Sequence, residues 1–351
     1  MQPARTRFIW ASTGPTTISD RLKIGSLGVT KRTAVDAPRI DTMKFGFSLV
    51  VRGNDATPDT FVQIAERAEA LEIDSLWCSA HVILPPQVKS GYVLIPGRKH
   101  PEHWKERYWE PFTVLSYLSA LTTKVTLGTT VVIAPMHNPI ELAKQVAEVD
   151  QLCGGRFVFG IGVGWFEEEF EVLGQDFHNR GARTDEALDL MKALWSDDPV
   201  SFEGRYYRVD NAHFAPKPLQ QPSPPIWVAG SSKAALKRAA RVAQAWHPVR
   251  PTFEYLREAR SDLNRYLAEA GRAPESLEIA VKLPLIFQDQ GPGLDQSPTQ
   301  GRSADIIDGI ERYREAGASH VVFDFVPENL ATALDTMERF AQEVRPQLSK
   351  P

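Results

Sequence analysis

The strongest constraint on the fold of this chain is a regular alternation of short apolar segments with longer amphipathic ones. The apolar segments are rich in Val, Ile, Leu and Phe, which is typical of parallel strands buried on both faces. The segments between them repeat their apolar residues with the period of a helix packed on one side. Strands are predicted over 44–51, 75–79, 125–132, 156–163, 226–229, 244–247, 277–287 and 320–325. Helices are predicted over 58–71, 112–121, 140–152, 183–195, 233–243, 253–271, 303–316 and 330–344.

Eight strand–helix units predict an α/β fold, a TIM (β/α)8 barrel over residues 43–346 with insertion loops at its C-terminal face. A doubly wound open sheet has the same alternation and is the alternative. No glycine loop for a nucleotide follows the first strand, which counts against that alternative. A hairpin of 206–209 with 213–215 is predicted outside the repeat. The long loop 82–109 follows the second strand and would lie on the active-site face.

The composition of the chain argues against several classes of protein. With 351 residues and 42% hydrophobic content the chain can bury a large core, and its net charge of −4 predicts neither a nucleic-acid nor a membrane partner. Its two cysteines lack the spacing of a zinc site, so we expect no metal and a cytoplasmic location. No apolar run is long enough to cross a bilayer. Residues 1–42 show no sustained apolar period, and we expect a disordered leader or a mis-assigned start, with Met43 as the true beginning.

The segment 154–165 is a predicted strand that ends in alternating glycines and then a tryptophan. Without side chains at Gly160, Gly162 and Gly164, a flat ligand would approach the backbone closely, and Trp165 would supply an aromatic wall. A tight strand-to-helix turn with no ligand is the alternative. The segment is not a dinucleotide fingerprint, because Trp165 stands where the third glycine would fall.

Three other strand ends carry candidate site residues. His81 follows the second strand, where an imidazole can donate a hydrogen bond to a ring or act as an acid or base, or simply cap the strand. Thr129–Val132 end the third strand, where hydroxyls and amides would bond a heterocycle, or β-branched residues would only fill the strand. Ala229-Gly230-Ser231-Ser232 leads from the fifth strand into a helix, as a phosphate cradle or a plain N-cap.

Weaker candidates surround these positions. Glu167-Glu168-Glu169 would be acid–base carboxylates or, more simply, an acidic first turn that complements a helix dipole. Glu110 suits a cap or a site, and His137 is a weakly supported site residue. A basic loop would bind an anionic tail or, by default, be a solvated charged loop; it holds Lys89, Arg98, Lys99, His100, His103, Lys105 and Arg107. No nucleophile elbow, P-loop or kinase motif is present.

Together these segments resemble the luciferase-like monooxygenase family, in particular its branch that uses the deazaflavin coenzyme F420. The resemblance covers nearly all of the chain from Met43 onward. It rests on the order and spacing of 44–48, 75–81 with Pro85-Pro86, 109–111, 127–139, 142–144, 150–165 with Glu169-Phe170, Arg180 with Asp185-Glu186, Trp195, and 225–232.

The resemblance implies roles for individual residues. It implies that His81 contacts the edge of the redox ring and that the Thr130–Val131 bond is a non-proline cis peptide bulging against the ring face. It implies further cofactor-binding residues: Gly162, Gly164 and Trp165 at the ring, and Ala229, Gly230, Ser231 and Ser232 at the phosphate. Family members are commonly dimers, so a homodimer is expected.

Three departures from the family pattern limit what is carried over. Ala80 replaces the acid that usually precedes the histidine, and Trp165 replaces the acid that protonates the substrate in sugar-phosphate dehydrogenase relatives. The usual Gly-Asp-Gly-Trp reads Ala243-Gln244-Ala245-Trp246. The second departure argues against the sugar-phosphate reaction.

The resemblance leaves three functions open. The favoured one is hydride transfer between coenzyme F420 and a small organic substrate, because the resemblance is strongest to the F420 branch. The basic loop, which would meet a polyglutamate tail, adds weak support. The first alternative is an FMNH2-dependent monooxygenase acting on an aldehyde or alkanesulfonate, with a separate reductase supplying reduced cofactor. The second is a barrel that binds flavin without turnover, because Ala80 replaces the expected acid.

Overall fold

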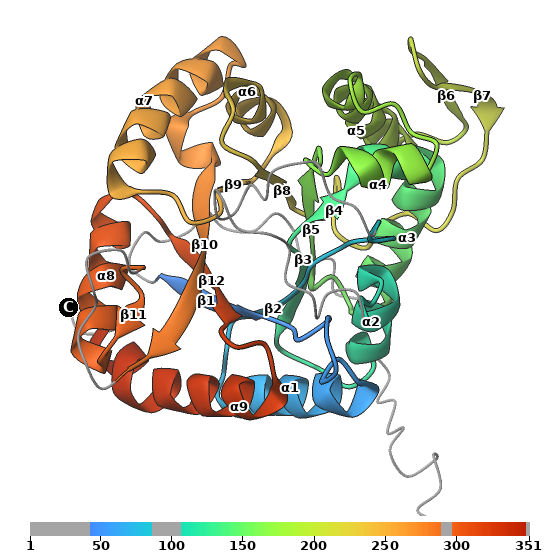
Figure 1. Ribbon diagram of the computed structural model, residues 1–351. Coiled ribbons are helices and arrows are strands. Elements are labelled where there is room, and N and C mark those ends of the chain that lie inside the picture. Colours follow the sequence, from blue (N-terminus) through green and yellow to red (C-terminus); the bar gives the residue numbers. More distant parts are fainter. Residues whose placement is uncertain (1–42, 86–106, 289–296, 349–351) are drawn as a thin grey trace, which may run out of the picture. The chain divides into compact units, whose positions relative to one another are not determined.

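Figure 1 shows the computed structural model of the protein, which describes residues 43–85, 107–288 and 297–348. Eight parallel strands pair in the order β1-β2-β3-β5-β8-β9-β10-β12, and β12 pairs with β1 to close the ring. The predicted TIM barrel is confirmed. The open-sheet alternative is wrong, because β9 and β10 also pair, so the barrel strands leave no free edge.

The barrel strands are β1 (Lys44–Ser48), β2 (Ser75–Cys78), β3 (Thr126–Thr129), β5 (Phe157–Gly162), β8 (Ile226–Ala229), β9 (Ala245–His247), β10 (Glu278–Phe287) and β12 (His320–Phe325). Two short strands, β4 (Val132–Ile133) and β11 (Gln300–Gly301), pair with β5 and β10 respectively. The predicted third strand is thus split into β3 and β4.

The helices α1 to α9 lie around the barrel (Figure 1). They are α1 (Pro58–Ala70), α2 (Pro111–Ser119), α3 (Pro139–Leu152), α4 (Glu167–Val172), α5 (Arg180–Ser196), α6 (Lys233–Val242), α7 (Phe253–Glu269), α8 (Ser303–Glu315) and α9 (Leu330–Arg339). The last continues through a π-helical turn, η5 (Phe340–Val344), into α10 (Arg345–Leu348), and 3-10 turns occur at η3 (Ala134–Met136) and η4 (Pro274–Ser276).

Local sequence explains where several helices begin. Thr57, Asn138, Ser232 and Thr252 each accept a hydrogen bond from a backbone N–H in the first turn of the following helix. Such caps satisfy amides that have no partner inside the helix, and each contributes about 1 kcal/mol to stability.

The barrel interior is a small cluster of strand residues, separate from the larger core between strands and helices. Its centre is a pair of stacked indoles, Trp77 and Trp227, with ring centroids 4.2 Å apart. Gly128 makes room for them, because a Cβ there would lie 2.3 Å from the ring of Trp77. The two large rings therefore fill the barrel and support the residues above them.

Two buried histidines complete the interior. His247 Nδ1 donates to the carbonyl of Ala280 (2.6 Å), so its Nε2 accepts from the hydroxyl of Thr130 (2.9 Å). His320 Nε2 pairs with Ser75 Oγ (3.0 Å). Burial lowers the pKa of His247 to about 4 and the pKa of His320 well below its ordinary value, so both rings are neutral at pH 7.

The predicted hairpin exists in a different place. Its strands are β6 (Val200–Glu203) and β7 (Arg208–Ala212), instead of 206–209 and 213–215. The carboxylate of Glu186 on α5 accepts hydrogen bonds from the backbone N–H groups of residues 205–207. The turn is closed by a backbone bond from Gly204 N–H to the carbonyl of Tyr207 (2.9 Å) and is also held by this distant side chain, which the local sequence does not reveal.

We expect the buried histidines to make folding pH-dependent. An unfolded histidine titrates near 6.5, so between pH 6.5 and about 4 the unfolded chain binds protons that folded His247 excludes. Stability therefore falls as pH falls through this window. When the pH is lowered from 7.0 to 5.5, the free energy of unfolding should fall by about 1 kcal/mol less in His247→Gln than in the parent protein. Urea denaturation at the two pH values measures this difference. Equal losses in the two proteins would contradict the assignment.

Candidate active site

The predicted site residues lie at the carboxyl-terminal end of the barrel strands. His81 follows β2, the Thr130–Val131 pair follows β3, Trp165 follows β5, and the segment 230–232 follows β8. Because the strands are parallel, these ends meet at the same face of the barrel.

A bulge interrupts the pairing of β3–β4 with β5. The last pair before it is Gly128 with Val158, and pairing resumes at Val132 with Ile161. Three residues on one strand therefore oppose two on the other, a distortion that re-aims side chains beside active sites. The peptide bond between Thr130 and Val131, inside this bulge, is cis, as the resemblance implied.

Thr129 and Gly160 hold the bulge in place. The hydroxyl of Thr129 donates to the carbonyl of Gly160 (2.7 Å) and accepts from its N–H (2.9 Å). A Cβ on Gly160 would lie 1.8 Å from the carbonyl oxygen of Thr129. Only glycine allows the two strands to approach this closely.

Gly162 and Gly164 also make room for side chains of the bulged segment and of β4. A Cβ on Gly162 would lie 2.9 Å from Val131 Cγ2, and one on Gly164 would lie 2.7 Å from Ile133 Cγ2. The space where side chains are absent is thus filled by protein, which corrects the expectation that it is open to a flat ligand. Lining of a ring by the backbone of Gly162 and Gly164 stays a prediction.

His81 is held by a buried carboxylate on α4. Its Nδ1 lies 2.7 Å from Glu169 Oε2, and the two side chains are 12% and 0% exposed. Glu169 Oε1 accepts from the backbone N–H groups of Val82 (2.7 Å) and Ile83 (3.2 Å). The imidazole also contacts Tyr108 edge-on.

Of the three consecutive glutamates 167–169, Glu169 does not fit the simpler interpretation of an acidic first turn that complements the helix dipole. The side chain of Glu167 is 41% exposed, as suits a surface residue near the helix dipole, whereas Glu168 and Glu169 are buried. Phe166, Glu169 and Phe170 are spaced three and four residues apart and share the buried face of the helix. This spacing was the signal in the sequence that would have identified Glu169.

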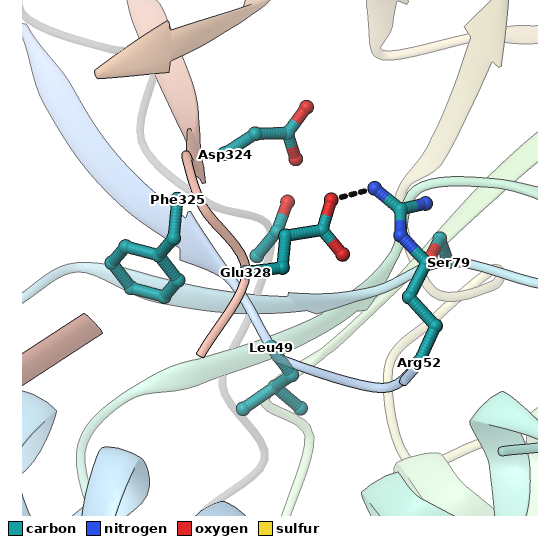
Figure 2. Close-up of a pocket in the computed structure, with 7 residues that line it drawn as sticks. Leu49, Arg52, Ser79, Asp324, Phe325 and Glu328 are labelled. Carbon is teal, nitrogen blue, oxygen red and sulfur yellow. Dashed lines mark hydrogen bonds and ion pairs between the residues drawn. The ribbon is translucent and has the colours of Figure 1, made fainter. Parts of the chain in front are cut away.

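A small cavity lies between the ends of β1, β2 and β12, and Figure 2 shows its lining. Arg52 and Glu328 form an ion pair beside it. Ser79, also in the lining, is hydrogen-bonded to the hydroxyl of Tyr108 (2.7 Å). Burial raises the pKa of Tyr108, and Arg52 offsets this in part. A neutral phenol therefore stands between this cavity and His81.

A buried ion pair joins the cavity to the bulge. Lys282 Nζ lies 3.2 Å from Asp324 Oδ1 and 3.5 Å from the carbonyl oxygen of Thr130. Burial alone would raise the pKa of Asp324, but Lys282 and Arg52 hold it below its usual range. The bulge is therefore bordered by fixed charges of both signs.

The amino end of α6 has the features of an N-cap. Ser232 Oγ accepts from the N–H of Ala235 (3.2 Å), and the carbonyl of Gly230 accepts from Trp246 Nε1 (2.8 Å). Gln244, at a departure from the family pattern, bonds the N–H of Ile226 (2.7 Å). Phosphate binding by Ala229 to Ser232 stays a prediction.

The weaker candidates from the sequence are Glu110, His137 and the basic loop, and the structure gives a role only to the first. Glu110 accepts from the backbone N–H groups of Phe112 and Thr113, so it caps α2. Burial lowers the pKa of His137, which stays an untested candidate. The basic loop lies outside the described residues except Arg107, which is exposed. In the described ranges no group of side chains suits a metal ion.

Comparison with known proteins places the chain in a family. The sequence profile of the luciferase-like monooxygenases matches residues 43–291. The chain belongs to this family. Luciferase-like monooxygenases are oxidoreductases, so the protein is an enzyme of this class. Over the described parts of the chain, no helix is both long enough and apolar enough to span a bilayer.

Relatives of this luciferase-like enzyme use different cofactors. This chain is 27% identical to an uncharacterized protein of Mycobacterium tuberculosis, over 81% of this chain and 94% of that protein. It is 32% identical to an FMNH2-dependent dimethylsulfone monooxygenase of Pseudomonas putida, over 51% of this chain and 49% of that one. Its fold matches the F420-dependent tetrahydromethanopterin reductase of Methanopyrus kandleri, with a TM-score of 0.71, 17% identity, and 88% and 99% of the two chains covered.

The close approach at Gly160 generates a stability prediction. Gly160→Ala should lower the free energy of unfolding by at least about 2 kcal/mol, because the new methyl group meets backbone that cannot move aside. The matched control is Gly181→Ala on α5, where the nearest atom is 3.7 Å away and alanine favours the helix. Urea unfolding measures both, and a Gly160→Ala protein as stable as the control would contradict the packing argument.

Proposed function

We propose that the protein transfers hydride between coenzyme F420 and a small organic substrate at the mouth of the barrel. The observation that carries this proposal is the placement of His81, with its Glu169 partner, after β2 and of the Thr130–Val131 bulge after the adjacent strand β3. The family resemblance gives these two positions the edge and the face of the redox ring.

The residues at the mouth fit such a cofactor. Val131 and Ile133 present half-buried apolar side chains, which suit the face of a flat ring. The first N–H groups of α6 lack partners inside the helix, and the segment 230–232 is exposed, as a phosphate site requires. When bound, the deazaflavin supplies hydride transfer at its carbon-5, and the protein orients it and excludes water.

The protein's own groups then have separate tasks. His81 accepts or returns a proton at the ring edge. The hydroxyl of Thr130 donates to neutral His247, so toward a ligand it offers only its acceptor lone pairs.

A second candidate is an FMNH2-dependent monooxygenase, with a separate reductase supplying the reduced flavin. It is favoured by the name of the Pseudomonas putida relative, which matches half of this chain. Both cofactors share a tricyclic ring and a phosphate, so the same mouth would hold either one. A homodimer and a cytoplasmic location stay predictions.

Anaerobic titration separates these functions. We expect the purified protein to bind reduced F420 with a Kd at least about tenfold lower than that for reduced FMN, a difference of about 1.4 kcal/mol. Quenching of tryptophan fluorescence measures the binding of both ligands. Tight binding of reduced FMN with none of F420 would replace the first function with the second. Binding without turnover of any offered substrate would favour a non-catalytic barrel.

A substitution at His81 tests the proposed proton transfer. His81→Ala should lower kcat about 100-fold, as expected for loss of a general acid–base group, and change cofactor Kd less than about threefold. His178→Ala is the control, because His178 is 84% exposed on the surface. Steady-state kinetics measure both variants, and an unchanged kcat in His81→Ala would remove this residue from the mechanism.

A further inference from the structure

We propose that Glu169 is the positioning residue of the site: it sets the tautomer of His81, so that the neutral imidazole offers Nε2 as its proton acceptor. This inference rests on the proposed function for its catalytic meaning. The structural part concerns the cofactor-free protein and stands on the geometry of the pair.

The hydrogen bond between the two side chains determines the tautomer. An ionised carboxylate only accepts hydrogen bonds, so at 2.7 Å the proton between the groups belongs to His81 Nδ1. In the neutral form of the imidazole the Nδ1–H is the ring's one N–H, and Nε2 then carries no proton. Glu169 is fully buried and His81 nearly so, which keeps water from competing for the bond.

The second carboxylate oxygen fixes the backbone that carries His81. Glu169 Oε1 accepts from the N–H groups of Val82 and Ile83, the two residues that follow the histidine. One carboxylate thus orients the ring and anchors its main chain together. The carboxylate cannot rotate without breaking a hydrogen bond to residues 81–83.

The surroundings of Glu169 hold the carboxylate still. Phe166, the N-cap residue of α4, and Phe170, within the helix, flank it and are 2% and 0% exposed. Arg180 Nε donates to the carbonyl of Gly164 (3.1 Å) and so fixes the turn between β5 and α4. The glycine run and the positioning residue are therefore parts of one rigid connection.

The pair also balances charge during the reaction. When the substrate releases an acidic proton to Nε2, the imidazole gains one positive charge, which the negative charge of Glu169 compensates across Nδ1–H. The reverse transfer restores neutral His81. No other oxidant or reductant is needed for this step.

The first test determines by NMR which nitrogen of His81 carries the proton. Long-range 15N–1H NMR of the cofactor-free protein, with His81→Ala to assign the signals, should show His81 protonated at Nδ1. Glu169→Gln should reverse this, because Oε1 of glutamine stays with the backbone N–H groups and its amide then donates to Nδ1. Protonation at Nε2 in the parent protein, or no change in the variant, would overturn the proposal.

The second test uses kinetics with whichever cofactor the titration identifies. Glu169→Gln should lower kcat about 10- to 100-fold and leave the KM for cofactor within about threefold. Glu167→Gln, on the exposed face of the same turn, should change neither. An unchanged kcat in Glu169→Gln would overturn the positioning role.

The two tests also separate this inference from the proposed function. If neither cofactor binds, the proposed function fails, while the NMR result still decides the role of Glu169. If Glu169→Gln does not fold by circular dichroism, the tautomer of the parent protein decides alone.

Discussion

The site depends on the contact between Thr129 and Gly160, where one hydroxyl bonds both backbone groups of the neighbouring strand. This contact occupies the point where strand pairing would otherwise continue, and it forces an extra residue into β3–β4. The bulge sends the hydroxyl of Thr130 to His247 and places Val131 against Gly162. Without glycine at positions 160 and 162, the bulge would have no room.

The interior below the bulge is apolar in bulk and neutral at its polar points. Stacked Trp77 and Trp227 fill the barrel, and burial keeps His247 and His320 uncharged. Buried charge borders the mouth, in the Lys282–Asp324 pair and in Glu169, the carboxylate partner of His81. A hydrogen-bonded neutral floor beneath a charged rim suits a flat cofactor, because the ring rests on packed side chains and its edge meets the titratable group.

The sequence predicted the barrel because strands and helices alternate regularly along the chain, and β8 and β12 agree with prediction to the residue. It predicted which strand ends meet, since parallel strands require it. It did not predict the hairpin, whose turn is bound by Glu186 from α5. It also missed the partner of His81, because residues 81 and 169 meet only after folding. The expectation of open space beside the glycines was wrong for a similar reason: the atoms that fill it come from residues 129–133 and from Phe170, which meet the glycines only after folding.

A crystal structure of the protein with F420, obtained without oxygen, tests the central claim most directly. We expect the ring face against Val131 at van der Waals distance, with His81 Nε2 at about 3 Å from the ring edge and the His81–Glu169 bond intact. A ring bound elsewhere, or one whose edge is out of reach of His81, would contradict the account.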